Sequence, residues 1–298
     1  MKIDDLIYRE LLDESGDPIF SFLPDGRYRY VNRAYAEGVG RKMEDIIGRT
    51  VWEILSKEEA DEKYAVVRKV FETGEGKVIE SSSETGGSVT YYLTTVKPVF
   101  DDRGRVSVVI CVSKNITDRK LAEDRLEYYA TTDELTGFVN RRTGLAILSR
   151  MHEMSLRSSK PFTICYVDIN DLKIVNDTYG HAEGDSLISA ACGAMRDSIR
   201  QMDTICRMGG DEFLILFPDC GLSDASQVWK RVVENMAEFN LRHVKPYLLS
   251  MSHGILQYDP ASRDSIESLL RRVDDLMYRE KRIYKKSRRG INNNGFFD

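Results

Sequence analysis

The sequence contains few cysteines, and their arrangement excludes two classes of protein. Its 298 residues include five cysteines, an odd number, scattered along the chain without a Cys-x-x-Cys pair. A disulfide framework and a structural zinc site both need paired or closely spaced cysteines, so neither is expected. We predict that all five thiols are reduced and buried, at Cys111, Cys165, Cys192, Cys206 and Cys220.

Long apolar runs are also missing. The longest runs, such as residues 106–112, are far shorter than the ~20 residues that a helix needs to span a bilayer. The first residues carry no signal-peptide core. We therefore predict a cytoplasmic protein without a membrane segment.

A surplus of basic residues is lacking as well. The 48 acidic residues outnumber the 43 lysines and arginines, which leaves a formal net charge of −5. Proteins that hold a nucleic-acid backbone usually present a basic surface, so no nucleic-acid partner is expected. A small phosphate-bearing ligand is still compatible, because such a site is local and needs no global charge.

The composition that remains is typical of a soluble globular protein. Hydrophobic residues make up 42% of the chain and charged residues 31%, and the length suggests two domains. The sequence pattern changes near residue 131. We predict an N-terminal domain at residues 1–118, a helical linker at 119–131, a second domain at 132–290 and a flexible tail at 291–298.

The first domain reads as a small α+β unit. The apolar run at residues 18–23, the turn Pro24-Asp25-Gly26 and the run at residues 28–31 together predict a β-hairpin. Helical patterns follow at residues 32–38, 43–46 and 58–73. Three strand-like runs come next, at residues 78–84, 88–100 and 106–115. This order predicts an antiparallel sheet with helices on one face.

Several phrases of this region resemble the PAS sensor domain family. They follow one another in the family's order, at residues 22–26, 31–34, 48–50 with Trp52, and 116–120. The resemblance implies a PAS-like sheet that senses a signal and contributes, with the linker, to a homodimer. We also expect Trp52 to belong to the core.

The ligand of the PAS-like domain is left open by the sequence. All four histidines lie downstream of it, at His152, His181, His243 and His253, so a histidine-ligated haem is not expected. Cys111 lies outside any flavin-adduct motif. The domain is therefore expected either to bind a small metabolite or to serve only as a dimerisation platform.

Residues 118–130 form a predicted helix. Ala122, Leu126 and Tyr129 follow one another at steps of four and three residues, with charged residues between them. That spacing predicts a parallel signalling coiled coil, although it covers fewer than two heptads. The alternative is a single amphipathic helix packed on its own domain.

From residue 131 onward, helices and strands alternate. The nearly continuous apolar run at residues 162–169 is typical of a strand buried on both faces. Helices are also expected at residues 141–157, 171–178, 182–202, 223–239 and 265–288, and strands at 204–207, 213–217 and 248–256.

Two of these strands meet across Gly209 and Gly210, and the acids Asp211 and Glu212 follow. Glycine reaches a positive φ without strain, so the turn is well specified. A Gly-Gly-Asp-Glu sequence alone is more often a solvated turn than a site. Its small glycines would nevertheless let the phosphates of a ligand approach the backbone.

Asp168 ends the buried strand at residues 162–169, just before a helix. Alone it would be a helix N-cap. If this strand end lies beside the hairpin, Asp168 converges with Asp211 and Glu212, and three carboxylates repel one another unless a cation joins them. Oxygen ligands with open positions suit Mg²⁺ or Mn²⁺ and a nucleoside triphosphate. The following helix offers free N–H groups to phosphates, and Lys173 adds a positive charge.

Together these motifs resemble the GGDEF family of diguanylate cyclases. The resemblance covers about 160 residues and is carried by Asp133-Glu134-Leu135-Thr136-Gly137, Asn140-Arg141-Arg142, residues 168–185 and residues 209–213. It implies a palm-like α/β sandwich, similar to nucleotidyl cyclases, with a mainly antiparallel central sheet. It also implies that a homodimer condenses two GTP into cyclic di-GMP and releases two pyrophosphates.

The resemblance assigns roles to the acidic residues and their neighbours. Two Mg²⁺ or Mn²⁺ ions would be held by Asp168, the backbone carbonyl of Ile169, Asp211 and Glu212. Catalysis would use Asp211 as proton acceptor, together with Glu212 and Lys173. Leu172, Gly209 and Gly210 would belong to the substrate-binding set.

The resemblance also implies how guanine is chosen. Guanine presents two adjacent donors, N1–H and N2–H₂, which a carboxylate can accept together. Asp185 matches the acid that reads guanine in the family, Asn176 matches its amide partner, and His181 lies between them. Adenine lacks both donors and would leave a buried Asp185 unpaired, so GTP is favoured.

The last predicted helix supplies cations. Lys281 and Lys285 are one turn apart on one face and are expected to grip the β- and γ-phosphates. The sequence departs here from the commoner family form, in which Gly-Arg-Asn follows shortly after the lysine. Residues 283–286 intervene instead.

A product-inhibition site is implied by the sequence Arg200-Gln201-Met202-Asp203. This R-x-x-D motif starts nine residues before Gly209, which is the family's offset. An arginine can donate two hydrogen bonds to guanine or to phosphate, and the acid can accept from the opposite edge. Arg231 is a candidate second arginine.

Two other functions stay open at this point. The chain could be a nucleotide-binding receptor without activity, or a different nucleotidyl cyclase on a similar palm-like fold. The four residues Asp168, Lys173, Asp211 and Glu212 favour activity over the first alternative, and Asp185 disfavours the second.

Overall fold

The computed structural model describes residue 7 and residues 10–85, 87–242 and 245–293. The chain divides into two compact units, Met1–Arg125 and Leu126–Asp298, with the division inside helix α6 (Thr117–Thr131). Each unit has its own sheet and its own apolar core, so each is described separately.

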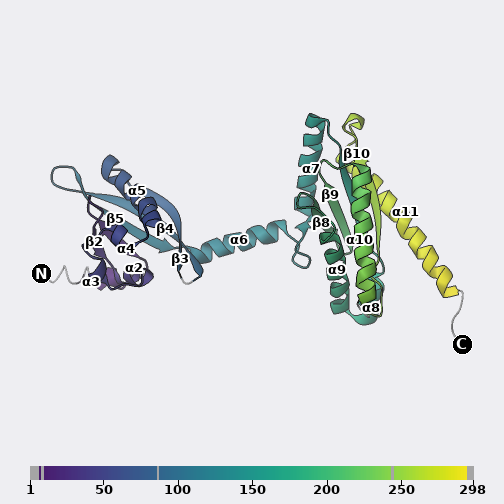
Figure 1. Ribbon diagram of the computed structural model, residues 1–298, viewed down its shortest axis with the longest axis horizontal. Coiled ribbons are helices and arrows are strands. Elements are labelled where there is room, and N and C mark those ends of the chain that lie inside the picture. The colour runs from purple at the N-terminus through teal and green to yellow at the C-terminus, as the bar shows by residue number, and fades with distance from the viewer. Residues whose placement is uncertain (1–6, 8–9, 86, 243–244, 294–298) are drawn as a thin grey trace. The chain divides into compact units, whose positions relative to one another are not determined.

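The N-terminal unit is built on an antiparallel sheet with strand order β2-β1-β5-β4-β3. Its strands are β1 (Ile19–Phe22), β2 (Tyr28–Val31), β3 (Lys77–Thr85), β4 (Ser88–Phe100) and β5 (Val106–Asn115). Its helices are α2 (Arg33–Gly38), α3 (Met43–Ile46), α4 (Val51–Ile54) and α5 (Lys57–Thr73). The helices cover one face of the sheet (Figure 1), which confirms the predicted PAS-like α+β fold.

One buried side chain joins strand β1 to helix α2. Asn32 is fully buried, and its Oδ1 accepts hydrogen bonds from the N–H groups of Tyr35 (3.0 Å) and Ile19 (2.9 Å). The first of these bonds caps α2. Asn32 therefore fixes where the chain leaves β2 and enters the helical layer.

The prediction for Trp52 is wrong. Its side chain is 41% exposed, and its indole N–H donates to Asp61 at 2.7 Å. Helix α4, which the sequence did not predict, begins at Val51 and turns the ring to the surface, where it packs edge-on against Tyr64. The indole needs a polar partner for its N–H, and a surface position supplies one.

The C-terminal unit has a second sheet, with strand order β10-β7-β9-β8-β6. Its strands are β6 (Val139–Asn140), β7 (Phe162–Ile169), β8 (Thr204–Gly209), β9 (Glu212–Phe217) and β10 (Met251–Tyr258). All neighbouring pairs are antiparallel except β6 and β8, which pair in parallel. The predicted mainly antiparallel central sheet is confirmed.

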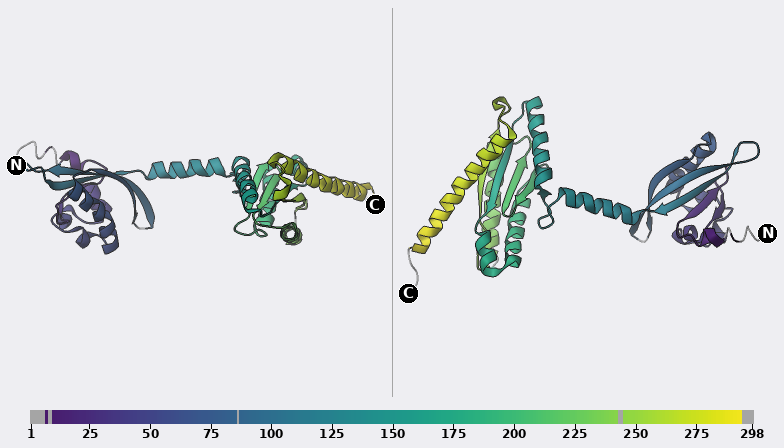
Figure 2. Two further views of the ribbon diagram at one scale, coloured as in Figure 1. Left: turned by 90° about the horizontal axis from the view of Figure 1, so that it is seen from above. Right: turned by 180° about the vertical axis from the view of Figure 1, so that it is seen from behind.

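Helices cover both faces of this sheet (Figures 1 and 2). Those of one face are α8 (Leu172–Tyr179), α9 (His181–Arg196) and α10 (Leu222–Arg242), and those of the other are α7 (Arg141–Ser158) and α11 (Ile266–Asn293). One core cluster joins the sheet to α8–α10 and a second joins it to α7 and α11. β7 contributes Val167 to the first cluster and Ile164 to the second, as expected of a strand buried on both faces.

Several boundaries in this unit differ from the prediction. α9 ends at Arg196 instead of residue 202, because Ser198 bonds back to the Ala194 carbonyl and Asp203 accepts the Arg200 N–H. β10 begins at Met251, not 248. α11 continues to Asn293, so residues 291–293 are helical, and the rest of the predicted tail lies outside the described residues.

Helix α6 carries none of its side chains in a core. All of its residues are described, and none is buried. The alternative of an amphipathic helix packed on its own domain is therefore wrong for this structure. Among the described residues, no helix is both long and apolar enough to cross a membrane.

Candidate functional site

The end of β7 and the β8–β9 hairpin lie side by side. Asp168 is the direct cross-strand partner of Glu212. The Ile169 N–H donates to the Asp211 carbonyl at 2.9 Å. The strand register thus places the end of β7, with Asp168, beside the hairpin that carries Asp211 and Glu212.

Asp168 is a buried carboxylate with one unsatisfied oxygen. It is 3% exposed, and its Oδ2 accepts from the Lys281 ammonium at 2.5 Å. Its Oδ1 is buried and has no hydrogen-bond partner among the described residues. Burial raises the pKa of Asp168 to about 6; Lys281 opposes this rise, while the charges of Asp211 and Glu212 add to it.

These features fit a site for a divalent cation. A buried carboxylate oxygen without a hydrogen-bond partner, close to two further carboxylates, raises the free energy of the folded state unless a cation binds it. Within the described residues, no three acidic, histidine or cysteine side chains close on one point by themselves. The donors here are all oxygen atoms, as Mg²⁺ prefers, and an ion would complete its shell with the Ile169 carbonyl, water and ligand phosphates.

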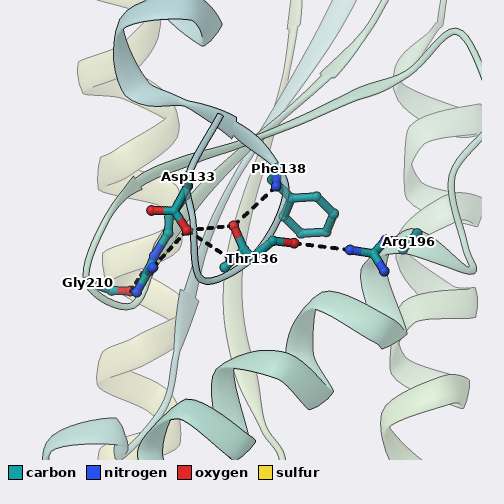
Figure 3. Close-up of polar contacts among 6 residues, drawn as sticks. Asp133, Thr136, Phe138, Arg196 and Gly210 are labelled. Atoms are coloured by element: carbon teal, nitrogen blue, oxygen red, sulfur yellow. Dashed lines mark hydrogen bonds and ion pairs between the residues drawn. The ribbon is translucent and has the colours of Figure 1, made fainter. Parts of the chain in front are cut away.

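The hairpin turn is held by Arg207. Its guanidinium donates twice to the Gly210 carbonyl, at 3.1 Å and 2.7 Å, and once to Asp133 at 2.9 Å (Figure 3). The pairing of β8 with β9 is irregular between Arg207 and Gly209. The planar fork of Arg207 therefore pins the turn at the point where the ladder of backbone hydrogen bonds is interrupted.

Asp133 and Thr136 form the other side of this network. Asp133 Oδ1 accepts from the Thr136 N–H (3.0 Å) and hydroxyl (2.8 Å), while Arg196 donates to the Thr136 carbonyl at 3.1 Å (Figure 3). The pKa of Asp133 is lowered: burial works against this, but the bonds from Thr136 and Arg207 outweigh it. The segment that follows α6 is thereby joined to the hairpin, a contact that sequence reasoning did not predict.

The glycines of the turn leave open space above the backbone. Gly209 and Gly210 have φ values of 147° and 51°, and a Cβ built on either would meet nothing within 4 Å. A side chain would be strained at these angles and would fill the space. The opening is compatible with the predicted approach of phosphates.

The residues predicted to read guanine lie on α8 and α9. A Cβ at Gly184 would come within 1.8 Å of Asn176 Oδ1, so only glycine lets α9 pack against this amide. Asp185 and His181 are exposed. The carboxylate of Asp185 therefore lies at the surface, and the expectation of a buried Asp185 is wrong for this chain.

The helix that follows Asp168 presents its residues in two different ways. Leu172 is 8% exposed and belongs to the core, so its side chain is a packing residue, and only its backbone is left to contact a substrate. Lys173 is exposed and free to turn toward an anion at the start of α8.

Helix α11 is fastened to the same region by several contacts. A Cβ at Gly254 would lie 2.2 Å from the Val273 carbonyl, so β10 and α11 approach closely only because residue 254 is glycine. Beyond Lys281, the Tyr284 hydroxyl donates to Asp171 at 2.8 Å, and Arg288 pairs with the same carboxylate. Lys285 is exposed. The sequence missed Asp171, because nothing local marks it as the partner of a helix more than a hundred residues away.

The residues predicted for product inhibition gather at one turn. Asp203 is buried and accepts the Arg200 N–H at 2.9 Å, and Arg231 donates to the Ser198 carbonyl at 2.7 Å. Burial raises the pKa of Asp203, while the nearby positive charges of Arg200 and Arg231 oppose that rise. The structure thus brings the three residues together.

The fold defines a nucleotidyl cyclase-like domain preceded by a PAS-like domain. Residues 130–287 match the family described as "Diguanylate cyclase, GGDEF domain", and residues 12–121 match the PAS fold. The first match covers more than half of the chain, and the chain belongs to the GGDEF diguanylate cyclase family.

Curated relatives match different shares of the chain. A diguanylate cyclase of Vibrio cholerae is 25% identical over 94% of this chain and 90% of its own length. Diguanylate cyclase DgcM of Escherichia coli is 28% identical over 65% of this chain, and cyclic di-GMP phosphodiesterase PdeR of the same species is 27% identical over 91%. The chain spans only 46% of the length of DgcM and 41% of that of PdeR.

Solved structures support the fold of the C-terminal unit. The coiled coil and GGDEF domain of DgcB from Caulobacter crescentus, crystallised with c-di-GMP, aligns with a TM-score of 0.51 and 24% identity. The alignment covers 56% of this chain and 88% of that one. At this identity the likeness concerns the fold alone.

Proposed function

We propose that this protein is a diguanylate cyclase, which condenses two GTP into cyclic di-GMP and releases two pyrophosphates. The observation that carries the proposal is the unpartnered, buried Oδ1 of Asp168 beside the hairpin acids Asp211 and Glu212, in a chain of the GGDEF family. A phosphate-bound cation at this oxygen would compensate the free-energy cost of burying it without a hydrogen-bond partner.

Asp168, the carbonyl of Ile169, Asp211 and Glu212 would hold Mg²⁺ or Mn²⁺. The bound metal would neutralise the phosphates and the developing negative charge. Asp211 takes the proton of the ribose 3′-OH of one GTP as that oxygen forms a bond to the α-phosphorus of the other. The bond between the α-phosphorus and the bridging oxygen breaks, pyrophosphate leaves, and the same step then closes the ring.

Cations of the chain assist at the phosphates. Lys173 lies at the start of α8, where helix N–H groups also favour an anion. Lys281 and the exposed Lys285 lie one turn apart on α11. In this mechanism Lys281 exchanges its bond with Asp168 for one with the β/γ-phosphates when metal and substrate bind.

Base selection rests on Asp185 and Asn176. The carboxylate accepts the two adjacent donors of guanine, while adenine offers no such pair. His181 opens α9 four residues before Asp185 and therefore lies on the same face of that helix. GTP is thus the preferred substrate.

The reaction requires two copies of the chain, because each domain holds one GTP. Leu126 and Tyr129 of α6 are 69% and 54% exposed, and with Ala122 they form the seam predicted for a parallel coiled coil. Pairing two such helices would bury these side chains. The proposed domain bounds are residues 1–118, a linker at 119–131 and residues 132–290.

The PAS-like domain has a cavity that suits a regulatory ligand. It has a volume of about 110 Å³, room for only a small molecule. The side chains of Phe20, Phe22, Tyr28, Val67 and Cys111 give it an apolar wall. The cavity also has polar groups in its wall. These are the hydroxyl groups of Tyr28 and Tyr35, which lie 2.5 Å apart, and the Glu59–Lys63 ion pair. A small, mainly apolar metabolite with one or two hydrogen-bonding groups fits this lining.

Product inhibition is the second regulatory element of the proposal. Asp203 accepts the Arg200 N–H, and Arg231 donates to the neighbouring Ser198 carbonyl; together they would offer two cations and one acid. Cyclic di-GMP offers guanine edges and phosphates that match these groups. Added product should lower the initial rate of the wild type and have less effect on Arg200→Ala; equal inhibition of both would contradict this assignment.

The central experiment is incubation of the pure full-length chain with GTP and Mg²⁺, followed by identification of products by mass spectrometry. We expect cyclic di-GMP and pyrophosphate from the wild type and none from Glu212→Gln, which keeps the shape of the side chain but loses its charge. The same assay on a variant lacking residues 1–116 detects activity that the sensor represses. Absence of cyclic di-GMP from both forms would refute the proposal.

A receptor that binds the nucleotide without turnover is the alternative. It is favoured by the ion pair between Lys281 and Asp168, which occupies one oxygen of that carboxylate. This reading predicts saturable GTP binding with no product in either form. The intact set of acids and Lys173 favours the enzyme.

A further inference from the structure

Tyr166 contacts a catalytic carboxylate through its hydroxyl. It lies on β7 two residues before Asp168, so the two side chains are on the same face of the sheet. Its Oη donates a hydrogen bond to Glu212 Oε2 at 3.2 Å. Glu212 is in turn the cross-strand partner of Asp168.

The direction of this hydrogen bond is set by chemistry. A tyrosine hydroxyl, whose ordinary pKa is about 10, is protonated at physiological pH. An ionised carboxylate only accepts. Tyr166 is therefore a permanent donor to one of the two oxygens of Glu212.

From this geometry we propose that Tyr166 is a positioning residue for the metal site: its hydroxyl holds one oxygen of Glu212 so that the other is presented to a divalent cation. The inference deepens the proposed function and rests on the metal site that function requires. A free glutamate has several rotamers, and the bond from Tyr166 selects among them before the ion arrives.

The surroundings of Tyr166 make the hydroxyl separable from the ring. The ring packs beside the core cluster between the sheet, α7 and α11, whereas the hydroxyl reaches the acidic end of the strand. Tyr166→Phe thus removes the hydrogen bond and keeps the packing. Tyr258→Phe is a matched control, because Tyr258 belongs to the same cluster and its buried hydroxyl has no partner among the described residues.

The test measures Mn²⁺ binding to the full-length chain by electron paramagnetic resonance, with a saturating non-hydrolysable GTP analogue present. Loss of a group that orients a metal ligand typically weakens metal affinity by about 10- to 100-fold. We expect a weakening in that range for Tyr166→Phe and none for Tyr258→Phe. An unchanged Mn²⁺ affinity in Tyr166→Phe would overturn the inference.

Steady-state kinetics give a second readout. Tyr166→Phe should need more Mg²⁺ for half-maximal rate and regain most of kcat at saturating Mg²⁺, with the KM for GTP then unchanged. A merely structural role would lower the active fraction at every Mg²⁺ concentration. In the Glu212→Gln background, Tyr166→Phe should have no further effect on Mn²⁺ binding, and an equal effect in both backgrounds would contradict action through Glu212.

These outcomes separate the inference from the proposed function. If the wild type binds Mn²⁺ with the nucleotide in a Tyr166-dependent way but makes no cyclic di-GMP, the enzyme proposal fails and the positioning role stands. If the wild type makes cyclic di-GMP and Tyr166→Phe behaves as the wild type, only the inference fails. If the wild type does not bind Mn²⁺ with the nucleotide, both fail.

Discussion

Lys281 Nζ lies 2.5 Å from Asp168 Oδ2, although the two residues are 113 positions apart in the chain. Both side chains are largely buried, with exposures of 19% and 4%. Helix α11 thus supplies a cation to the end of β7. The contact joins the last helix of the chain to the acidic site.

Replacing Lys281 by methionine should destabilise the chain. The substitution keeps the length of the side chain but leaves Asp168 without its charged donor, which costs about 1.5–3 kcal/mol for a hydrogen bond between charged groups. Urea unfolding in the presence of EDTA measures this loss. Lys285→Met, one turn further and exposed, is the control, and equal stability of the two variants would contradict a role for the pair.

Mg²⁺ should raise the thermal stability of the wild type. An ion that binds the folded chain stabilises it by about 2.7 kcal/mol at 100 times its dissociation constant. Asp168→Asn should lose this response, because the amide keeps the shape but not the charge. Thermal unfolding with Mg²⁺ and with EDTA is the measurement, and an undiminished Mg²⁺ response in Asp168→Asn would place the ion elsewhere.

Arg207→Met should weaken both fold and activity. It removes the link that Arg207 makes between Asp133 and the Gly210 carbonyl. The side chains of Asp133 and Arg207 are 26% and 12% exposed. We expect a loss of about 2 kcal/mol, below the ~3–5 kcal/mol of fully buried pairs. Arg157→Met, which breaks an exposed pair with Glu153, should cost at most about 1 kcal/mol.

The stability difference between wild type and Arg207→Met should depend on pH. The pKa of Asp133 is lowered in the folded state, so its contribution is present above the unfolded pKa of about 3.9 and is lost as pH falls through the folded value. Unfolding at pH 7 and at pH 3 measures the change. A difference that grows toward acid pH would contradict the sign.

The five thiols should resist modification in the native state. Burial raises the pKa of Cys111 to about 12 and that of Cys206 to about 11, and the reactive thiolate is therefore scarce at pH 8. All five cysteines are free and buried. We expect negligible reaction with a disulfide reagent in buffer and five equivalents in guanidinium chloride; fast native labelling would contradict the burial.

Leu126→Lys should weaken dimer formation. The substitution places a charge in the proposed seam of α6, where two copies would otherwise bury leucine. Analytical ultracentrifugation of the full-length chain should show a shift toward monomer, with a parallel loss of cyclic di-GMP synthesis. Glu127→Lys, on the same helix but outside the seam, is the control. A wild type that is monomeric at all concentrations would contradict the proposed pairing.

Local periodicity determined most of the elements of this fold. The bounds of α3, β4, β5 and β7 agree with the prediction, because alternating or continuous apolar residues between turn signals leave a single choice of element. Helix ends were harder. The end of α9 depends on Ser198 and Asp203, whose side chains compete for backbone groups beyond the range of helical periodicity.

The sequence by itself gave rise to the chemistry proposed for the site, since acids, glycines and cations at characteristic spacings predict a metal-assisted nucleotide site. Only the tertiary structure decided which side chains meet there. Lys281 with Asp168, Arg207 with Asp133, and Tyr166 with Glu212 are pairs that depend on strand register and helix packing. Contacts between side chains far apart in sequence follow from the folded arrangement of the backbone, which no local pattern encodes.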